Sequence, residues 1–168
     1  MLILGLVIII DMKFHEKMMR EAIKIAKRGI EKGQSPFGCV IVKDRKIIAR
    51  AHNTVLLTHD PTAHAEINAL RKASKKLKTH DLKGCIVYST CEPCPMCFSA
   101  IHWANADMIV YGASIEDAAA LGFRELHISN YKMKELGGSR VEIIGGVLRE
   151  ECVKMMKEWS KRSDARTY

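Results

Sequence analysis

Long hydrophobic runs are nearly absent from this sequence of 168 residues. The one extended apolar stretch, residues 2–10, is shorter than the ~20 residues that a membrane-spanning helix needs. It has neither a basic start nor a small-residue cleavage site, so it does not read as a secretory signal. We interpret residues 1–11 as an extra N-terminal segment, either a mis-assigned start or a strand docking on a neighbour. Residues 12–168 then form a single domain, with no membrane involved.

Low-complexity tracts and internal repeats are also missing, and aromatic residues make up only 6% of the chain. With 48% apolar and 27% charged residues, the composition is that of an ordinary globular protein. No aromatic-rich basic loop, of the kind that favours single-stranded nucleic acid, is present. The net charge of +8 nevertheless permits a nucleic-acid partner. Because the cations gather only loosely, in residues 71–83 and 154–166, we favour solvated helix faces over a binding stripe.

The six cysteines do not form the spaced pattern of a disulfide framework. Three of them fall within residues 91–97. Such clustering suits metal binding far better than disulfide bonding, and it implies a reducing compartment. We therefore expect a cytoplasmic protein.

Two short segments carry the candidate chemistry. Residues 62–66 read T-A-H-A-E, and residues 92–97 read E-P-C-P-M-C. An H-x-E followed by P-C-x-x-C is the signature of zinc nucleobase deaminases. His64, Cys94 and Cys97 would bind one Zn²⁺ per chain and leave a fourth position for water. An open fourth position is typical of a catalytic zinc, because a structural zinc normally has four protein ligands.

The choice of cysteines is open to an alternative, because Cys91 and Cys94 form a second C-x-x-C pair. Pro95 favours Cys94 and Cys97, since it fixes these two residues in one helical turn. Cys91 is then a small buried residue beside the site. A purely structural zinc would need a fourth protein ligand, for which His59 and Cys91 are the candidates.

Glu66 is the candidate general acid and base. Two thiolates and a neutral imidazole cancel the zinc charge, so a carboxylate is needed to take a proton from water. The spacing of Glu66 from His64 places it on another side of the helical turn, better positioned to reach water than to bind the metal. Both ligand segments are expected at helix N-termini, which stabilise thiolates.

Hydrophobic periodicity predicts an alternation of helices and strands. Residues 14–30 form an amphipathic helix that Gly33 ends, and a hairpin follows with its turn at residues 43–45. Asp60 and Pro61 are expected to be the N-cap and first residue of the next helix. A hairpin followed by this alternation predicts an α/β fold, a three-layer α/β/α arrangement with a mixed five-stranded sheet. Strands are expected at residues 38–42, 46–51, 85–89, 108–111 and 141–144, and further helices at 61–77, from 94 onward, 115–121 and 148–161.

From the first expected helix to the last, the chain resembles the cytidine-deaminase-like superfamily. Residues 60–67 (DPTAHAEI) look like both the bacterial guanine deaminases and the tRNA adenosine deaminases. Segments that lean toward the guanine deaminases are 35–42 (SPFGCVIV), 91–97, 100–104 (AIHWA) and 118–123 (AAALGF). Segments that look like the C-terminal part of the tRNA enzymes are 140–144 (RVEII) and 146–152 (GVLREEC).

The resemblance implies hydrolytic deamination of a nucleobase or nucleoside, first of the guanine type, with release of ammonia. Glu66 would take a proton from water, protonate the ring nitrogen and help the amine to leave. A tRNA adenosine deaminase, or a cytosine or cytidine deaminase, is the alternative. A non-catalytic zinc module is disfavoured by Glu66 and by the open fourth position.

Carried over residue by residue, the resemblance also implies substrate contacts. Asn53 would contact the base or its sugar, although a turn residue closing the hairpin is an equal alternative. The backbone N–H of Ala65 would donate to a substrate carbonyl. Phe37 and Trp103 would line or stack on the ring, unless they are core residues. Glu125 stands where guanine deaminases carry an aspartate, two residues beyond a Gly-Phe pair, that acts as a second proton carrier.

The C-terminus raises the question of assembly. The chain ends on Tyr168, and guanine deaminases of this kind end on an aromatic that closes a neighbour's pocket. The resemblance therefore implies a homodimer in which residues 148–161 and the tail reach toward the partner's site. Met155, Met156 and Trp159 give this helix apolar bulk for a partner, or for packing on its own sheet. A frayed terminus is the simpler alternative for the tail.

Overall fold

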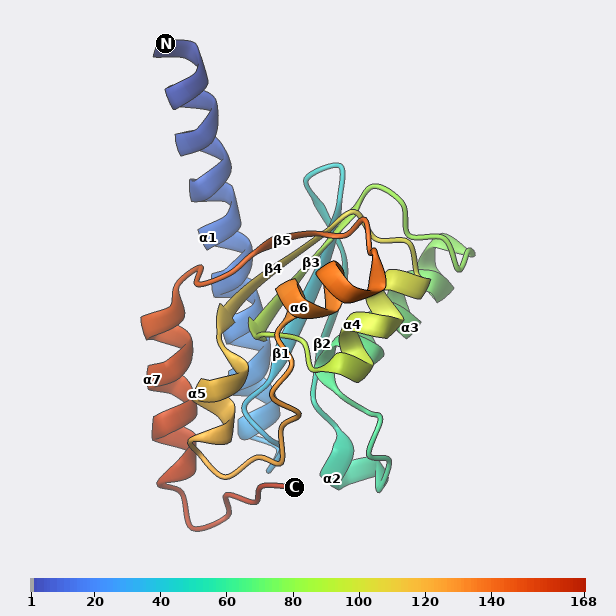
Figure 1. Ribbon diagram of the computed structural model, residues 1–168. Helices are drawn as coiled ribbons and strands as arrows, with labels where there is room; N and C mark the ends of the chain where they lie inside the picture. Colours follow the sequence, from blue (N-terminus) through green and yellow to red (C-terminus); the bar gives the residue numbers. More distant parts are fainter. Residues whose placement is uncertain (1) are drawn as a thin grey trace.

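A mixed five-stranded sheet forms the middle layer of the computed structural model, which describes the backbone of residues 2–168 and the side chains of residues 11–168 (Figure 1). The strand order is β2-β1-β3-β4-β5. The central part of the sheet is antiparallel on the β1 side and parallel from β3 to β5. The strands are β1 (Gly38–Lys43), β2 (Lys46–His52), β3 (Cys85–Cys91), β4 (Met108–Ala113) and β5 (Glu142–Ile144).

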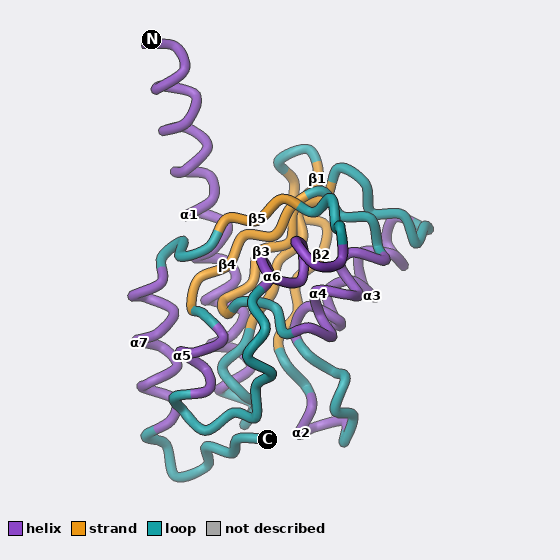
Figure 2. The backbone as a smooth tube through the Cα atoms, in the orientation of Figure 1, coloured by secondary structure: helices purple, strands orange, loops and turns teal. Residues whose placement is uncertain are grey.

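Helices cover both faces of this sheet (Figures 1 and 2). Helices α1, α5 and α7 pack on one face, and α3 and α4 pack on the other, with α6 against α4. The expected three-layer α/β/α fold with a mixed five-stranded sheet is confirmed. The helices are α1 (Leu2–Ile30), α2 (Val55–Thr58), α3 (Ala65–Leu77), α4 (Pro95–Trp103), α5 (Ile115–Ala119), α6 (Asn130–Gly137) and α7 (Arg149–Ser160).

The alternation of side chains along β1 explains why this strand reads as a continuous apolar run. Val40 and Val42 belong to the core shared with α1 and α7, whereas Cys39 and Ile41 belong to the core beneath α3 and α4. A strand buried on both faces has no solvent side that would require polar residues. The central strands therefore form a rigid platform whose ends can position a site.

Residues 2–11 differ from the docking strand that was one interpretation of this segment. Their backbone is helical and continuous with the rest of α1. No proline interrupts residues 2–30, so helical hydrogen bonding can run through the whole segment. The side chains of residues 1–10 lie outside the described part, and the division of residues 1–11 from the domain 12–168 stays a prediction. Within the residues that are described, no helix is both long and apolar enough to cross a membrane.

The start of α3 is the second difference from expectation. Asp60 does not cap this helix; its Oδ1 accepts hydrogen bonds from the Thr62 N–H at 2.8 Å and the Thr62 hydroxyl at 2.7 Å. These bonds close a separate turn, so the helix starts at Ala65, with His64 in extended conformation as its N-cap. The prediction of Asp60 and Pro61 at the helix start is therefore wrong. Helices α2 and α6 were not predicted, because both are short and their periodicity is weak.

Candidate active site

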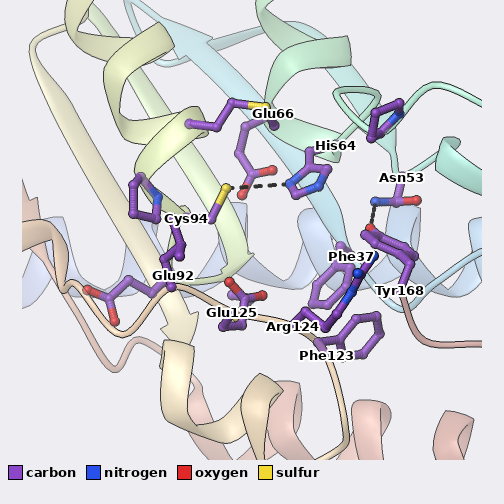
Figure 3. Close-up of a pocket in the computed structure, with 15 residues that line it drawn as sticks. Phe37, Asn53, His64, Glu66, Glu92, Cys94, Phe123, Arg124, Glu125 and Tyr168 are labelled. Atoms are coloured by element: carbon purple, nitrogen blue, oxygen red, sulfur yellow. Dashed lines mark hydrogen bonds between the residues drawn. The ribbon is translucent and has the colours of Figure 1, made fainter.

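Two helix starts face one another beyond the end of β3. His64 is the N-cap of α3 and Cys94 is the N-cap of α4, each in an extended conformation. Neither side chain makes a capping hydrogen bond to its own helix, so both are free to face the space between the helices (Figure 3). Pro95 occupies the first helical position of α4, where a missing N–H costs nothing. The extended N-cap conformations of His64 and Cys94 thus direct both side chains into the same space between the two helix starts.

Three ligand atoms gather in this space. The Sγ atoms of Cys94 and Cys97 each lie 3.6 Å from Nδ1 of His64. A zinc ion with Zn–S bonds of ~2.3 Å and a Zn–N bond of ~2.1 Å at tetrahedral angles separates sulfur from nitrogen by about 3.6 Å. In the described part of the chain, one group of three candidate ligands lies within 4.8 Å of one another, and it is this group. The residues present therefore fit a tetrahedral Zn²⁺.

The structure separates the two overlapping cysteine pairs. Cys91, the last residue of β3, directs its Sγ to the carbonyl of Ser114 at 3.4 Å. Neither Cys91 nor His59 belongs to the group of candidate ligand atoms found among the described residues. The geometry therefore favours Cys94 and Cys97 as the cysteine ligands.

Glu66 lies beside the ligand group with its carboxylate held in place. One oxygen accepts a hydrogen bond from the Ser89 hydroxyl at 2.8 Å, and the other lies 3.6 Å from Sγ of Cys97. Glu66 is only 5% exposed, and burial raises the pKa of its carboxyl. Ser89 was missed by sequence reasoning. It could have been found, because polar residues near the carboxyl end of a central strand commonly face a site.

The three ligand side chains shift one another's pKa values even without a metal ion. Hydrogen bonds from Cys97 and His64 lower the pKa of Cys94 to about 4. The same bond to Cys94, together with burial, raises the pKa of Cys97. Burial lowers the pKa of His64, but the hydrogen bond to Cys94 and the nearby negative charges raise it overall. One thiolate is thus already favoured, and metal coordination deprotonates the other thiol as well.

A cavity of about 380 Å³ opens beside the ligand group. Its wall includes the segment between α5 and α6, which contributes Phe123 and Glu125 (Figure 3). Burial and the negative charge of Cys94 raise the pKa of Glu125 to about 7. The lining residues are Phe37, Asn53, Pro61, His64, Glu66, Cys91, Glu92, Cys94, Pro95, Met96, Phe123, Arg124, Glu125, Leu126 and Tyr168.

Of the four expected substrate-contact residues, the structure places two in the cavity wall, one at the start of α3 and one far from the cavity. Phe37 lines the cavity and packs edge-on against Phe123, with ring centroids 4.8 Å apart. Asn53 is fully buried and also lines the cavity. Ala65 is the first residue of α3, so its N–H is one of those that a helix start leaves without an intrahelical acceptor. Trp103 is 84% exposed at the far end of α4 and does not line the cavity, so its expected place on the ring is wrong.

Asn53 serves the turn and faces the cavity at the same time. Its Oδ1 accepts a hydrogen bond from the N–H of Val55 at 3.0 Å, at the start of α2. Its Nδ2 donates to the hydroxyl of Tyr168 (Figure 3). The two alternatives for Asn53 are therefore compatible, because one amide end fixes the turn while the other faces the cavity.

Tyr168 lines the cavity of its own chain. Besides Asn53, its ring meets Phe123 edge-on at 5.6 Å and lies 5.9 Å from the ring of His64. Its carbonyl accepts a hydrogen bond from the N–H of Arg124 at 3.1 Å. The expected reach of the tail toward a partner's site is not what this chain shows.

Comparison with known proteins places this site in a family. Residues 12–113 match the family model of the cytidine and deoxycytidylate deaminase zinc-binding region. The guanine deaminase of Bacillus subtilis (strain 168) is 48% identical over 115 residues, which cover 68% of this chain and 74% of that protein. The tRNA-specific adenosine deaminase of Haemophilus influenzae is 40% identical over 141 residues, which cover 83% and 79%. A solved structure in complex with 2,6-diaminopurine has a TM-score of 0.82 at 29% identity, covering 89% of this chain and 82% of the other.

The family match and the fold agree with one another. The match of residues 12–113 spans both helix starts and the strands that hold them. The chain belongs to the cytidine and deoxycytidylate deaminase zinc-binding family, and it is a zinc-dependent hydrolase that deaminates a nucleobase or nucleoside.

Proposed function

We propose that the substrate is a free purine base, guanine before others, which places the reaction in purine metabolism. The size of the cavity is the observation that carries this proposal. At about 380 Å³ it is near the small end of ligand pockets, which range over ~300–1,000 Å³. Tyr168 and Phe123 line it from within the same chain and pack on one another, so the C-terminal tail takes up room that a polynucleotide would need. The 48% identity to a guanine deaminase supports the same substrate.

His64, Cys94 and Cys97 are proposed as the zinc ligands and Glu66 as the general acid and base. Bound zinc supplies a water of lowered pKa at the substrate carbon. Glu66 takes a first proton from the attacking water and delivers it to the neighbouring ring nitrogen. It then takes the second proton from the hydroxyl that has been added to the ring carbon and gives it to the leaving amine. The oxygen of water bonds to the ring carbon, the carbon–nitrogen bond breaks, and ammonia leaves. The bond from Ser89 holds the carboxylate in one orientation during these transfers.

The remaining cavity residues are proposed to hold the base. Phe37 and Asn53 line the cavity, where Phe37 can pack against the ring and Asn53 can donate to it. The N–H of Ala65, which is not a lining residue but begins α3 next to His64, can donate to a carbonyl acceptor. Glu125 is proposed as a second proton carrier. With a pKa of about 7, it can both accept and release a proton near neutral pH.

A panel of bases and nucleosides tests the substrate. Guanine, guanosine, 2,6-diaminopurine, cytosine, cytidine and adenosine are compared for ammonia release at saturating zinc. We expect the highest kcat/KM for guanine and slower turnover of the nucleosides, because the tail leaves little room for a ribose. Inosine formed in tRNA, without release of ammonia from any free base, would contradict the proposal.

A tRNA adenosine deaminase stays the alternative, because one such enzyme is 40% identical over a longer stretch of 141 residues. The net charge of +8 also permits contact with a phosphate backbone. Binding of this kind weakens steeply with salt, since phosphate contacts release counterions. A tRNA gel shift at two salt concentrations, paired with inosine analysis, distinguishes the two substrates.

We also propose a homodimer and a reducing, cytoplasmic compartment. Three of the six cysteines fall within residues 91–97, a spacing that suits metal binding better than disulfides, which supports the compartment. Exposed apolar side chains support the dimer. Five of them lie on α4, on α6 and in the segment before α6, here called the α4–α6 surface: Trp103, Leu126, Ile128, Tyr131 and Leu136.

A further inference from the structure

One buried carboxylate bridges the starts of two helices that are far apart in the sequence. Glu92, two residues before Cys94, is 5% exposed. Its Oε1 accepts a hydrogen bond from the N–H of Asn130 at 2.8 Å, and its Oε2 accepts one from the N–H of Ile115 at 3.3 Å. Ile115 is the first residue of α5 and Asn130 is the first residue of α6. Glu92 therefore binds both ends of the segment 115–130.

Asn130 strengthens the same link from the opposite side. Its Nδ2 donates a hydrogen bond to the carbonyl of Pro93 at 2.6 Å, and the residue is fully buried. The backbone and the side chain of Asn130 thus both bind the turn that leads into Cys94. Since buried hydrogen bonds to a charged group are strong, this connection is expected to persist in solution.

The segment between these two ends has few other attachments. Within the described residues, one hydrogen bond joins the stretch 120–129 to a distant part of the chain, from the N–H of Arg124 to the carbonyl of Tyr168. The stretch also packs through two apolar side chains: the ring of Phe123 lies against Phe37, Trp159 and Tyr168, and Leu121 lies against the core shared with α1 and α7. The stretch nevertheless supplies four cavity-lining residues, among them Glu125. Its position must therefore depend strongly on how its two ends are held.

We infer that Glu92 is a positioning residue that sets the substrate-facing segment 123–126 relative to the metal-ligand turn. Its own carboxylate points away from His64, so it does not take part in the transfer of protons (Figure 3). A carboxylate suits this task because it has two oxygens and no hydrogen, and can therefore accept from two N–H groups at once. The inference rests on the proposed function only for the roles of Phe123 and Glu125.

The test replaces Glu92 by glutamine, which has nearly the same shape but a single acceptor oxygen. One of the two N–H groups then faces an NH₂ group and loses its bond. We expect faster amide hydrogen exchange in peptides covering residues 115–130, with exchange in β1 and β3 and the zinc content unchanged. We also expect kcat/KM for guanine to fall about 10- to 100-fold, because Phe123 and Glu125 are displaced. A loss of folded or zinc-loaded enzyme would lower the apparent kcat and leave KM unaltered.

Glu116→Gln is the matched control, because Glu116 is exposed on α5, next to Ile115. Asn130→Ala is a second variant that keeps the N–H bond to Glu92 but removes the bond to Pro93; it should raise exchange in residues 120–130. If Glu92→Gln does not fold, this variant decides. Unchanged exchange in residues 115–130, exchange raised equally across the sheet, or an unchanged kcat/KM at full zinc content would overturn the inference. If the wild type does not deaminate guanine, the proposed function fails, while exchange and zinc content still decide the role of Glu92.

Discussion

Glu66 combines burial with two polar neighbours on a single carboxylate. Glu66→Gln should keep the fold and the zinc, because the amide oxygen can still accept the hydrogen bond from Ser89. We expect kcat to fall by at least ~10²-fold, the lower end for loss of a general acid–base. Ammonia release and zinc per chain are measured together, with the exposed Glu158→Gln as the control. Near-native turnover at full zinc occupancy would remove Glu66 from this role.

His15 offers a residue-scale prediction for stability. Its Nδ1 lies 2.8 Å from the hydroxyl of Tyr88, and both residues are buried between α1 and the sheet. Burial lowers the pKa of His15, and Arg45 lowers it further while Asp11 opposes. The unfolded chain therefore takes up this proton at a higher pH than the folded chain. The free energy of unfolding should fall as the pH drops through about 6.5, and level off below the folded pKa.

His15→Gln removes this titration. Urea unfolding at about pH 7.5 and about pH 5 should show a larger loss of unfolding free energy for the wild type than for the variant. Protonation of the zinc ligands affects both proteins equally, so the difference isolates His15. Equal losses in the two proteins would show that His15 does not titrate differently on folding.

At the scale of elements, the starts of α3 and α4 build the metal site. Their N-terminal N–H groups favour negative charge, and Pro95 fixes the first turn of α4. Cys94→Ala or Cys97→Ala should therefore lose most of the zinc, while Cys91→Ala should retain it. Elemental analysis of the purified variants measures this directly. A Cys91→Ala protein without zinc, beside a Cys97→Ala protein that keeps it, would reverse the choice of cysteine pair.

The C-terminal tail is the second element with a predictable effect. Tyr168 lines the cavity next to Asn53 and Phe123, where its ring fills space that water would otherwise occupy. Deletion of residues 163–168 should lower kcat/KM clearly while the unfolding temperature changes little. The reason is that the tail adds little to the main core. Tyr168→Phe, which keeps the ring but not the hydroxyl, should lie between the wild type and the truncated chain. Full activity of the truncated chain would contradict this role.

At the scale of the whole molecule, the structure points to a different dimer interface from the α7 interface expected from the sequence. Met155, Met156 and Trp159 are at most 4% exposed in the core of their own chain, so the apolar bulk of α7 does not await a partner. The α4–α6 surface instead exposes Trp103 at 84% and Leu136 at 74%. Large exposed apolar side chains that gather on one region are typical of protein interfaces.

Light scattering of the wild type should therefore give the mass of a dimer. The double change Trp103→Lys and Leu136→Lys should shift it to a monomer, because each charge would have to be desolvated in the interface. Leu57→Lys is the control, since Leu57 is 65% exposed on α2, outside the α4–α6 surface. A wild type that is monomeric at working concentration would disprove the dimer.

The fold could be predicted from local signals. The continuous apolar sequence of β1 indicates a strand that is buried on both faces, and Pro95 after Cys94 indicates the start of α4. The start of α3 could not be predicted in this way, because Asp60 bonds equally well into a turn as into a helix cap. Short helices such as α2 and α6 are stabilised by tertiary contacts more than by propensity.

Local signals in the sequence were enough to find the candidate site: His64, Glu66, Cys94 and Cys97 lie on two short segments, at the starts of α3 and α4. The surroundings of this site depend on contacts between distant parts of the chain. Asn53 donates a hydrogen bond to Tyr168 at the other end of the chain, and Glu92 accepts hydrogen bonds from Ile115 and Asn130. Such contacts join distant parts of the chain through hydrogen bonds and packing that leave no periodic pattern, so they become visible only when the chain is folded.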